Sequence, residues 1–550
     1  MTPKLENIPQ NLNIGSVVTR TIEAPYQSDP LSVYRALCKN KTHSLLLESA
    51  EIDKKHLLKS LLLTDCAVKI VCQGNTVTFT PLSLNGVAAI EFAKSQLADK
   101  AEIIESTFEV ENHFATELKI TFPEVPTELD EKSRLLSTNA FQSLRLFKAL
   151  DNQSNHPFAV FLGGVFAFDM ISVSEELPEV PEGENTCPDF VYYLAETLVI
   201  IDHESFSTEI ISNVFSGQNQ TQVIEKIDSR LNTIRQQLAN EIKAPEFNQI
   251  KPSEVTLTSD ISDQQFCQIV NDLKENIKAG DIFQVVPSRT FSLPCKDTIN
   301  AYQELKKSNP SPYMFYMQDS DFCIFGASPE SAIKYQQHNR QVEIYPIAGT
   351  RPRGFDKNGN FSPDLDSRIE LELRLDKKEL AEHIMLVDLA RNDIARVSQP
   401  GTRHVADLLK VDRYSHVMHL VSRVCGTLSE DLDALHAYQA CMNMGTLSGA
   451  PKVKATELIR KSEGKRRGSY GGAVGYLTGE GEMDTCIVIR SAFVKEGIAQ
   501  VQAGAGVVYD SNPQAEADET RQKAQAVINA IKKASMIETV LTESMPEETL

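Results

Sequence analysis

The 550-residue chain contains no tryptophan and lacks the features that mark several large classes of protein. No run of eighteen apolar residues occurs, so we expect no membrane-spanning helix. The N-terminal segment is polar and has no apolar centre of the kind found in signal peptides, which favours a cytoplasmic location. The ten cysteines are scattered singly, without a CxxC pair or a zinc-like Cys/His spacing, so reduced thiols are expected.

Positive charge is also scarce. The 55 Lys and Arg residues face 75 Asp and Glu residues, giving a formal net charge of −20. This balance disfavours nucleic acid or an anionic membrane as the main partner, although it allows a local basic pocket for a small anion. The hydrophobic content of 41% and charged content of 24% are typical of a soluble globular protein, and the length predicts two or three domains.

The pattern along the chain divides it into four parts. Residues 20–215 mix strands and helices, residues 216–262 read as a helix followed by a linker, residues 263–533 form a larger unit with many strands in its second half, and residues 534–550 form an acidic tail.

Two local predictions concern strands. Residues 158–171 are expected to form a strand–turn–strand or a strand–helix unit with a break at Gly163–Gly164. Residues 483–494 are expected to form one strand that contains Arg490.

A repeated pair of carboxylates is the most informative feature. Glu379 and Glu382 lie in one predicted helix, and Glu516 and Glu519 lie in another. A spacing of three residues places each pair on one helix face, where like charges repel unless something neutralises them. Four carboxylates on two helices have the oxygen donors that Mg²⁺ prefers. For a single pair, a solvated acidic face is the commoner explanation.

The segment IYPIAGTRPRG (344–354) is a strand end interrupted by Gly and Pro. Gly349 and Thr350 offer a backbone donor and a hydroxyl to a carboxylate, and Arg351 and Arg353 add positive charge to the same turn. An ordinary basic turn is the alternative.

Four further features are candidates for a site that binds a ligand or catalyses a reaction. The glycines of residues 503–508 allow backbone to approach a ligand, or merely ease strand packing. Arg490 is a charge in an apolar run and is expected to pair, for example with a carboxylate ligand. Glu330 follows a predicted strand, where burial would let it donate a proton. His419 lies in an apolar stretch, where a histidine is more often a core residue than a catalyst.

Ten segments occur in an order that identifies a family. They are LLLESAE, SNPSPYMFYM, ASPES, PIAGTRPRG, KELAEHIMLVDLARND, HVMHLVS, MGTLSGAPK, GSYGGAVGY, DTCIVIRS and QAGAGVVYDSNPQAEADET. Together they closely resemble the large subunit of anthranilate synthase (component I), a chorismate-utilising lyase. The resemblance is dense over 263–530 and thinner over 20–215. It implies an α/β fold of the α+β type, with large, mostly antiparallel sheets and flanking helices.

The resemblance also implies roles for individual residues in converting chorismate and ammonia to anthranilate and pyruvate, the first committed step of tryptophan biosynthesis. Glu382 and Glu519 match the ligands of Mg²⁺, and Glu379 and Glu516 match the carboxylates that support them. The positions that match chorismate contacts are Gly349, Thr350, Tyr470, Arg490, Gly504, Ala505 and Gly506. Glu330 matches the acid that helps the ring hydroxyl to leave, and His419 and Thr446 match positions near the ring. Either hydrogen bonding or base catalysis explains His419.

Two positions distinguish this chain from related enzymes. Aminodeoxychorismate synthases typically have a nucleophilic lysine where this chain has Ala348, and isochorismate and salicylate synthases have a water-activating lysine where it has Gln284. Both differences favour direct attack of ammonia, through an aminodeoxyisochorismate intermediate. The alternatives are an aminodeoxychorismate synthase and a non-catalytic tryptophan-sensing regulatory subunit.

The resemblance implies feedback inhibition by L-tryptophan and a partner chain. The positions that match the tryptophan site are Ser49, Lys59, Pro312, Tyr313 and Met314, with Glu48 as a neighbour. Plain core packing also explains the residues from 312 to 314. A Gly-x-Cys-x-Gly-x-Gln glutaminase motif is absent from the sequence, so a separate glutamine amidotransferase (component II) is expected to supply ammonia. A heterotetramer is common in the family.

Overall fold

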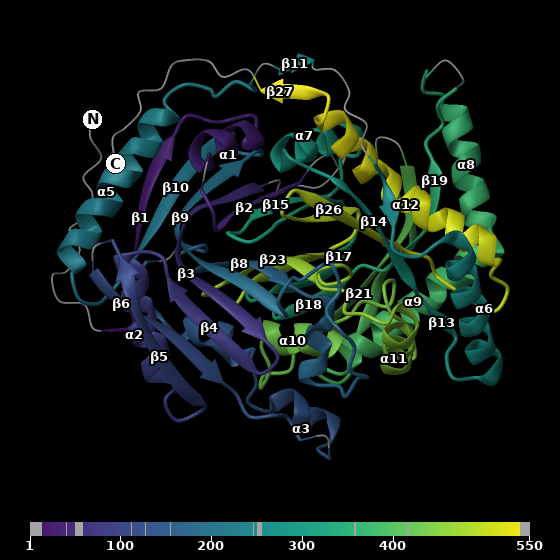
Figure 1. The fold of residues 1–550 in the computed structure, drawn as a ribbon, viewed down its shortest axis with the longest axis horizontal. Coiled ribbons are helices and arrows are strands. Elements are labelled where there is room, and N and C mark those ends of the chain that lie inside the picture. Colours follow the sequence, from purple (N-terminus) through teal and green to yellow (C-terminus); the bar gives the residue numbers. More distant parts are fainter. Residues whose placement is uncertain are drawn as a thin grey trace.

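The computed structural model describes most of the chain and confirms the predicted fold class. The described residues are 14–39, 41–49, 59–111, 113–126, 128–154, 156–245, 247–249, 256–356, 359–414 and 417–539. Most of the predicted acidic tail and part of the predicted linker lie outside these ranges. The structure combines helices with large, mostly antiparallel ladders of strands (Figure 1). No helix among the described residues is long and apolar enough to cross a membrane.

Two long antiparallel strands, β3 (Lys59–Gln73) and β9 (Phe190–Asp202), connect two sheets. Different strands flank the two halves of each long strand, so the ladders diverge from this pair. The first sheet continues through β1 (Ser16–Ala24), β10 (Ser207–Phe215), β2 (Ser44–Glu48), β15 (Tyr313–Gln318), β16 (Cys323–Ser328), β25 (Ser491–Lys495), β26 (Ile498–Gly504) and β14 (Ser288–Pro294). The second continues through β5 (Glu102–Val110), β6 (His113–Thr121), β4 (Thr76–Pro81), β8 (Phe161–Phe166), β23 (Ala473–Thr478), β24 (Met483–Ile487), β17 (Ser331–Gln336), β18 (Gln341–Ile344), β21 (Val417–Thr427), β19 (Ile347–Pro352) and β20 (His404–Arg413).

Alternating side chains build one core between the sheets and another beneath the helices. On β15, Phe315 and Met317 pack between the sheets, whereas Met314 and Tyr316 face the helices. The helices that cover the outer face of the first sheet are α1 (Pro30–Cys38), α5 (Gln220–Gln237), α7 (Thr298–Ser308) and α12 (Pro513–Ala534). The second sheet packs against α2 (Leu84–Leu97), α9 (Lys377–Ala395) and α10 (Ala434–Cys441).

Both local predictions are wrong about where the chain breaks, each for a packing reason, although the predicted strand–helix unit is present as β8 and the 3₁₀ helix η2 (Phe168–Val173). Strand β8 runs through Gly163–Gly164 without a break, because a Cβ at Gly164 would overlap the Val191 carbonyl oxygen of the neighbouring strand. The glycines there serve close approach of strands rather than a turn. Residues 483–494 form two strands, β24 and β25, because Arg490 has a left-handed backbone (φ 50°) that interrupts the ladder.

The two helices predicted around the glutamate pairs are present. Asp376 caps α9 by accepting hydrogen bonds from the Lys378 and Glu379 amides. Asn512 caps α12, and Pro513 occupies its first turn. Each helix therefore begins shortly before its glutamate pair, where the positive end of the helix dipole favours carboxylates.

Candidate active site

Glu330 lies between β16 and β17, with its side chain buried. The Thr446 hydroxyl donates a 3.0 Å hydrogen bond to Glu330 Oε1. Burial raises the pKa of Glu330 to about 8, against the opposing effects of the Thr446 hydrogen bond and of the positive charges of Lys523 and Arg490. The carboxyl group is therefore mostly protonated at neutral pH and is able to donate a proton.

Arg490 lies beside this carboxyl group. Its left-handed backbone is held by a 3.1 Å hydrogen bond from the Ala327 amide to the Arg490 carbonyl oxygen. Burial lowers the pKa of Arg490, and the nearby acidic groups of Tyr470, Glu519 and Glu330 oppose that effect. Within the described part of the chain, its guanidinium has no ion-pair or hydrogen-bond partner. A largely buried, unpaired arginine is suited to bind a carboxylate.

His419 and Thr350 face each other across the pair β19–β21. Thr350 Oγ1 lies 2.9 Å from His419 Nδ1. Burial and, to a smaller extent, the Arg490 charge lower the pKa of His419 to about 4, against the opposing effect of a hydrogen bond to the Gly349 backbone. The imidazole is therefore neutral at pH 7. Gly349 has φ 77° at the register shift of this strand pair, a conformation that favours glycine.

Tyr470 and the Gly504–Gly506 turn are close-packed. A Cβ at Gly504 would lie 3.1 Å from Tyr470 Oη, and one at Gly506 would lie 3.2 Å from Gln284 Nε2. The Ala505 amide donates a 3.1 Å hydrogen bond to the Pro287 carbonyl oxygen. Burial raises the pKa of Tyr470 to about 12, so its hydroxyl stays protonated. A side chain at either glycine would therefore crowd Tyr470 or Gln284.

The four glutamates of α9 and α12 influence one another across the two helices. Burial raises the pKa of Glu382, and the negative charges of Glu379, Glu519 and Glu516 raise it further, against the charge of Lys378. No three acidic, histidine or cysteine side chains converge at metal-binding distance in the residues that the structure describes.

Basic side chains neutralise these carboxylates. Arg351 Nη1 donates to Glu379 Oε1 at 3.0 Å, and Lys523 Nζ lies 2.6 Å from Glu519 Oε1. The oxygen-only donor set matches the chemistry of Mg²⁺, which would have to displace these bases. Arg353 is bound to Asp366, so neither basic residue of the 344–354 turn is left without a carboxylate partner.

Two supporting residues were not predicted. Lys523 Nζ also donates a 3.0 Å hydrogen bond to the Gly504 carbonyl oxygen, which links α12 to the glycine turn. The sequence did contain a signal for this residue, because a lysine four residues after Glu519 on a helix is placed to form an ion pair with it. Arg467, only 1% exposed, donates to the Leu447 and Val286 carbonyl oxygens and pairs with buried Glu463. No sequence pattern indicates which backbone carbonyl oxygens will accept hydrogen bonds from a buried arginine.

The candidate tryptophan residues divide between two faces of the first sheet. Strand β2 pairs with β3 on one edge and with β15 on the other. Continuing both registers places Ser49 level with Lys59 and with Tyr313, so these three share the face between the sheets.

The remaining candidates lie on or near the opposite face. Met314 points toward the helix-covered face, and Glu48 accepts hydrogen bonds there from Tyr302 (2.5 Å) and Lys306 (2.6 Å). Pro312 is buried just before β15.

Comparison with known proteins identifies the family. The model of the family described as chorismate binding enzyme matches residues 105–529. Anthranilate synthase component 1 of Vibrio cholerae serotype O1 is 59% identical over 92% of this chain and 95% of its own length. The chain belongs to this family.

Other members support the assignment. Anthranilate synthase component 1 of Escherichia coli K12 is 54% identical over 93% of this chain and 96% of its own length. The crystal structure of anthranilate synthase component I from Streptococcus pneumoniae TIGR4 matches with a TM-score of 0.64 and 28% identity, covering 87% of this chain and 94% of that chain. The relatives named component 1 identify this family member as an anthranilate synthase subunit, and the chorismate-utilising fold is shared.

Proposed function

We propose that this chain converts chorismate and ammonia to anthranilate, pyruvate and water. The observation that carries the proposal is a buried Glu330, whose pKa is raised to about 8, close to the guanidinium of Arg490, which has no partner among the described residues. Chorismate has two carboxylates and a ring hydroxyl, so it needs a cation for binding and an acid for loss of the hydroxyl.

Each group has a defined task in this proposal. Arg490, the Gly504–Gly506 backbone and Tyr470 bind the enolpyruvyl carboxylate. Glu330 donates its proton to the departing hydroxyl, which leaves as water. Ammonia bonds to the ring carbon next to the carboxylate-bearing carbon, the two ring double bonds shift toward the carbon that loses the hydroxyl, and the new ammonium group loses one proton. Thr446 holds the Glu330 carboxyl group in place through its hydrogen bond.

Neutral His419, held by Thr350, then lies near the ring for the second half of the reaction. Its imidazole either accepts the ring proton or hydrogen-bonds to the substrate while pyruvate leaves. Because its pKa is about 4, its protonation does not change between pH 6 and 9.

Glu382 and Glu519, supported by Glu379 and Glu516, would hold Mg²⁺. The ion supplies positive charge for the ring carboxylate of chorismate. The mutual effects of the carboxylates on the pKa of Glu382, across two helices, support this assignment.

The proposal includes a regulator and a partner. L-tryptophan would bind near Ser49, Lys59 and Tyr313 and oppose chorismate binding. A separate amidotransferase chain, component II, would supply ammonia from glutamine, and a heterotetramer is the expected assembly.

The alternative of an aminodeoxychorismate synthase is disfavoured because the side chain of Ala348, on β19, contains no nucleophilic group.

A substitution in the carboxylate cluster tests the proposal. Turnover of chorismate with ammonium and Mg²⁺ should fall at least about a hundredfold in Glu519→Ala, because Mg²⁺ would lose a ligand and the ring carboxylate would lose the cation that binds it. Asp518→Ala is the matched control, since this neighbouring carboxylate is exposed and should be dispensable. The measurement is anthranilate fluorescence against Mg²⁺ concentration. Undiminished turnover in Glu519→Ala would refute the metal assignment.

A further inference from the structure

A short segment between two helices carries Thr446. It comprises residues 442–451 and lies between the end of α10 at Cys441 and the start of α11 (Lys452–Glu463). Thr446 donates the hydrogen bond to the buried carboxyl group of Glu330. Groups in an active site keep a productive geometry only when the residues around them are themselves held in place. Whatever fixes this segment therefore also affects Glu330.

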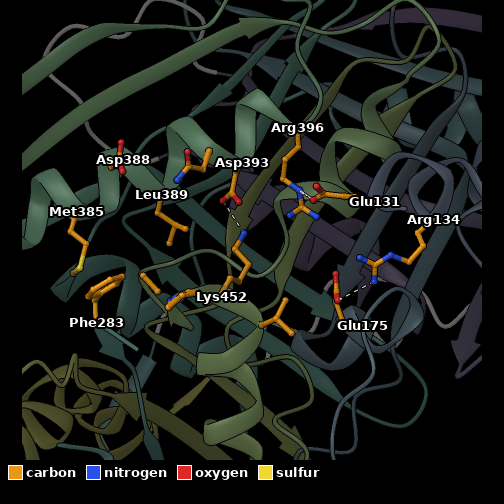
Figure 2. A pocket seen from close by; sticks show the side chains of 14 residues that line it. Glu131, Arg134, Glu175, Phe283, Met385, Asp388, Leu389, Asp393, Arg396 and Lys452 are labelled. Atoms are coloured by element: carbon orange, nitrogen blue, oxygen red, sulfur yellow. Dashed lines mark hydrogen bonds and ion pairs between the residues drawn. The ribbon is translucent and has the colours of Figure 1, made fainter. Parts of the chain in front are cut away.

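A buried lysine closes the segment. Lys452 Nζ donates a 2.7 Å hydrogen bond to the Cys441 carbonyl oxygen, so the two residues that flank the segment are in direct contact. The same ammonium group lies 2.8 Å from Asp393 Oδ2 on α9. Figure 2, which looks into a pocket beside α9, shows the Lys452 side chain pointing toward Asp393. Lys452 is only 8% exposed and Asp393 only 4%.

The two acceptors of Lys452 belong to different helices. Cys441 is the last residue of α10, where a carbonyl oxygen has no partner within the helix and the helix dipole favours a cation. Asp393 supplies the negative charge from α9. Burial raises the pKa of Asp393, and the charge of Lys452 is the main opposing effect. The nearby Arg396 pairs with Glu131, so it does not replace Lys452 as the partner of this carboxylate.

Helix α9 meets the segment at a second point. A Cβ at Gly445 would lie 2.1 Å from Leu389 Cδ2, so the segment packs directly on α9 one residue before Thr446. Leu389 and Asp393 are four residues apart and share a helix face. Glu382 lies on the same helix, nearer its N-terminus. The helix that carries a candidate metal ligand therefore also supports the segment that holds the acid.

We infer that Lys452 is a positioning residue for the reaction. By binding Asp393 and the Cys441 carbonyl oxygen together, it fixes the segment 442–451 on α9 and keeps Thr446 within hydrogen-bonding distance of Glu330. The inference rests on the proposed function, because it requires Glu330 to be the acid. Lys452 acts through Thr446 and not on the substrate itself.

The double variant Lys452→Met/Asp393→Asn tests the inference, because it removes both buried charges and leaves neither unpaired. Thr446 should then lose its bond to Glu330, and losing a hydrogen bond that favours the charged carboxylate raises the pKa of Glu330 further. The fall in kcat expected near pH 8 should move up by about one pH unit, and kcat at pH 7 should drop about tenfold. The measurement is kcat for anthranilate formation from pH 6 to 10, with saturating chorismate and Mg²⁺ and a constant concentration of unprotonated ammonia.

Two further variants identify the cause of such a shift. Thr446→Val should produce the same upward shift, and adding it to the double variant should produce no further one, because both changes remove the same hydrogen bond. Lys454→Met is the matched control. This lysine also lies on α11, but its side chain is 40% exposed and pairs with Glu457, so the pH profile should not move.

The outcomes separate this inference from the proposed function. If the unaltered chain makes no anthranilate, or its kcat does not fall up to pH 10, the proposed role of Glu330 is overturned. If kcat falls near pH 8 and the double variant leaves that fall in place, the positioning role alone is overturned. A further shift on adding Thr446→Val also overturns it, because Lys452 would then act by another route.

A second variant covers a failure to fold. Lys452→Gln/Asp393→Asn keeps polar side chains at both positions, but the glutamine is one bond shorter than lysine and carries no charge. It replaces the methionine variant if circular dichroism shows that the latter is unfolded. The same upward shift is expected of it, and an unchanged profile would again contradict the positioning role.

Discussion

Glu330 shows how burial changes the chemistry of one residue. An exposed glutamate is ionised at neutral pH, whereas burial raises the pKa of Glu330 to about 8. The sequence predicted that this glutamate follows a strand and that, once buried, it donates a proton. Its protonation state depends on residues more than a hundred positions away, such as Thr446, and no local pattern contains that information.

The Glu330 assignment predicts a pH dependence. A raised carboxyl pKa means that the proton is present below about pH 8 and is lost above it, so activity should fall as the pH rises through about 8. The rate of anthranilate formation should be measured from pH 6 to 9.5, with the concentration of unprotonated ammonia and saturating chorismate held constant.

Glu330→Gln provides the check on this pH profile. The amide keeps the size of the side chain but has no acidic proton to transfer, so kcat should fall about a hundredfold or more. A rate that stays level up to pH 9.5 in the unaltered chain would contradict the assignment of Glu330 as the acid.

At the scale of elements, periodicity predicted the helices well and the strands less well. The apolar spacing around the glutamate pairs indicated α9 and α12 because each helix buries one face. The strand errors at Gly163–Gly164 and at Arg490 arise from contacts with neighbouring strands. Such contacts depend on the topology, which was not determined by the local sequence.

The family resemblance predicts a tryptophan site that includes Lys59, and the pairing of β2, β3 and β15 brings Lys59 level with Ser49 and Tyr313. Lys59→Met should weaken tryptophan binding about tenfold, because a charged partner of the ligand carboxylate is lost. Because the chain contains no tryptophan, the fluorescence of added L-tryptophan reports binding directly. Lys39→Met removes the same charge from an exposed position and should leave the affinity unchanged. Equal affinities in the two variants would exclude Lys59 from the site.

At the scale of the whole molecule, the two sheets connect the candidate regulatory and catalytic regions. Strands β2 and β3 lie on one side of the molecule, and α9 and α12 reach the other (Figure 1). Strands from 20–215 pair directly with strands from 263–533, as in β2–β15 and β8–β23. The predicted four-part division therefore stays a prediction. If tryptophan opposes chorismate, chorismate must oppose tryptophan to the same extent.

The central claim is that ammonia becomes the amino group of anthranilate at this site. The most direct test is mass spectrometry of the product formed from chorismate, Mg²⁺ and ¹⁵N-labelled ammonium by the purified chain alone. The account predicts anthranilate that carries one ¹⁵N atom, together with pyruvate. A labelled aminodeoxychorismate that is not converted to an aromatic product, or the absence of any labelled product, would contradict it.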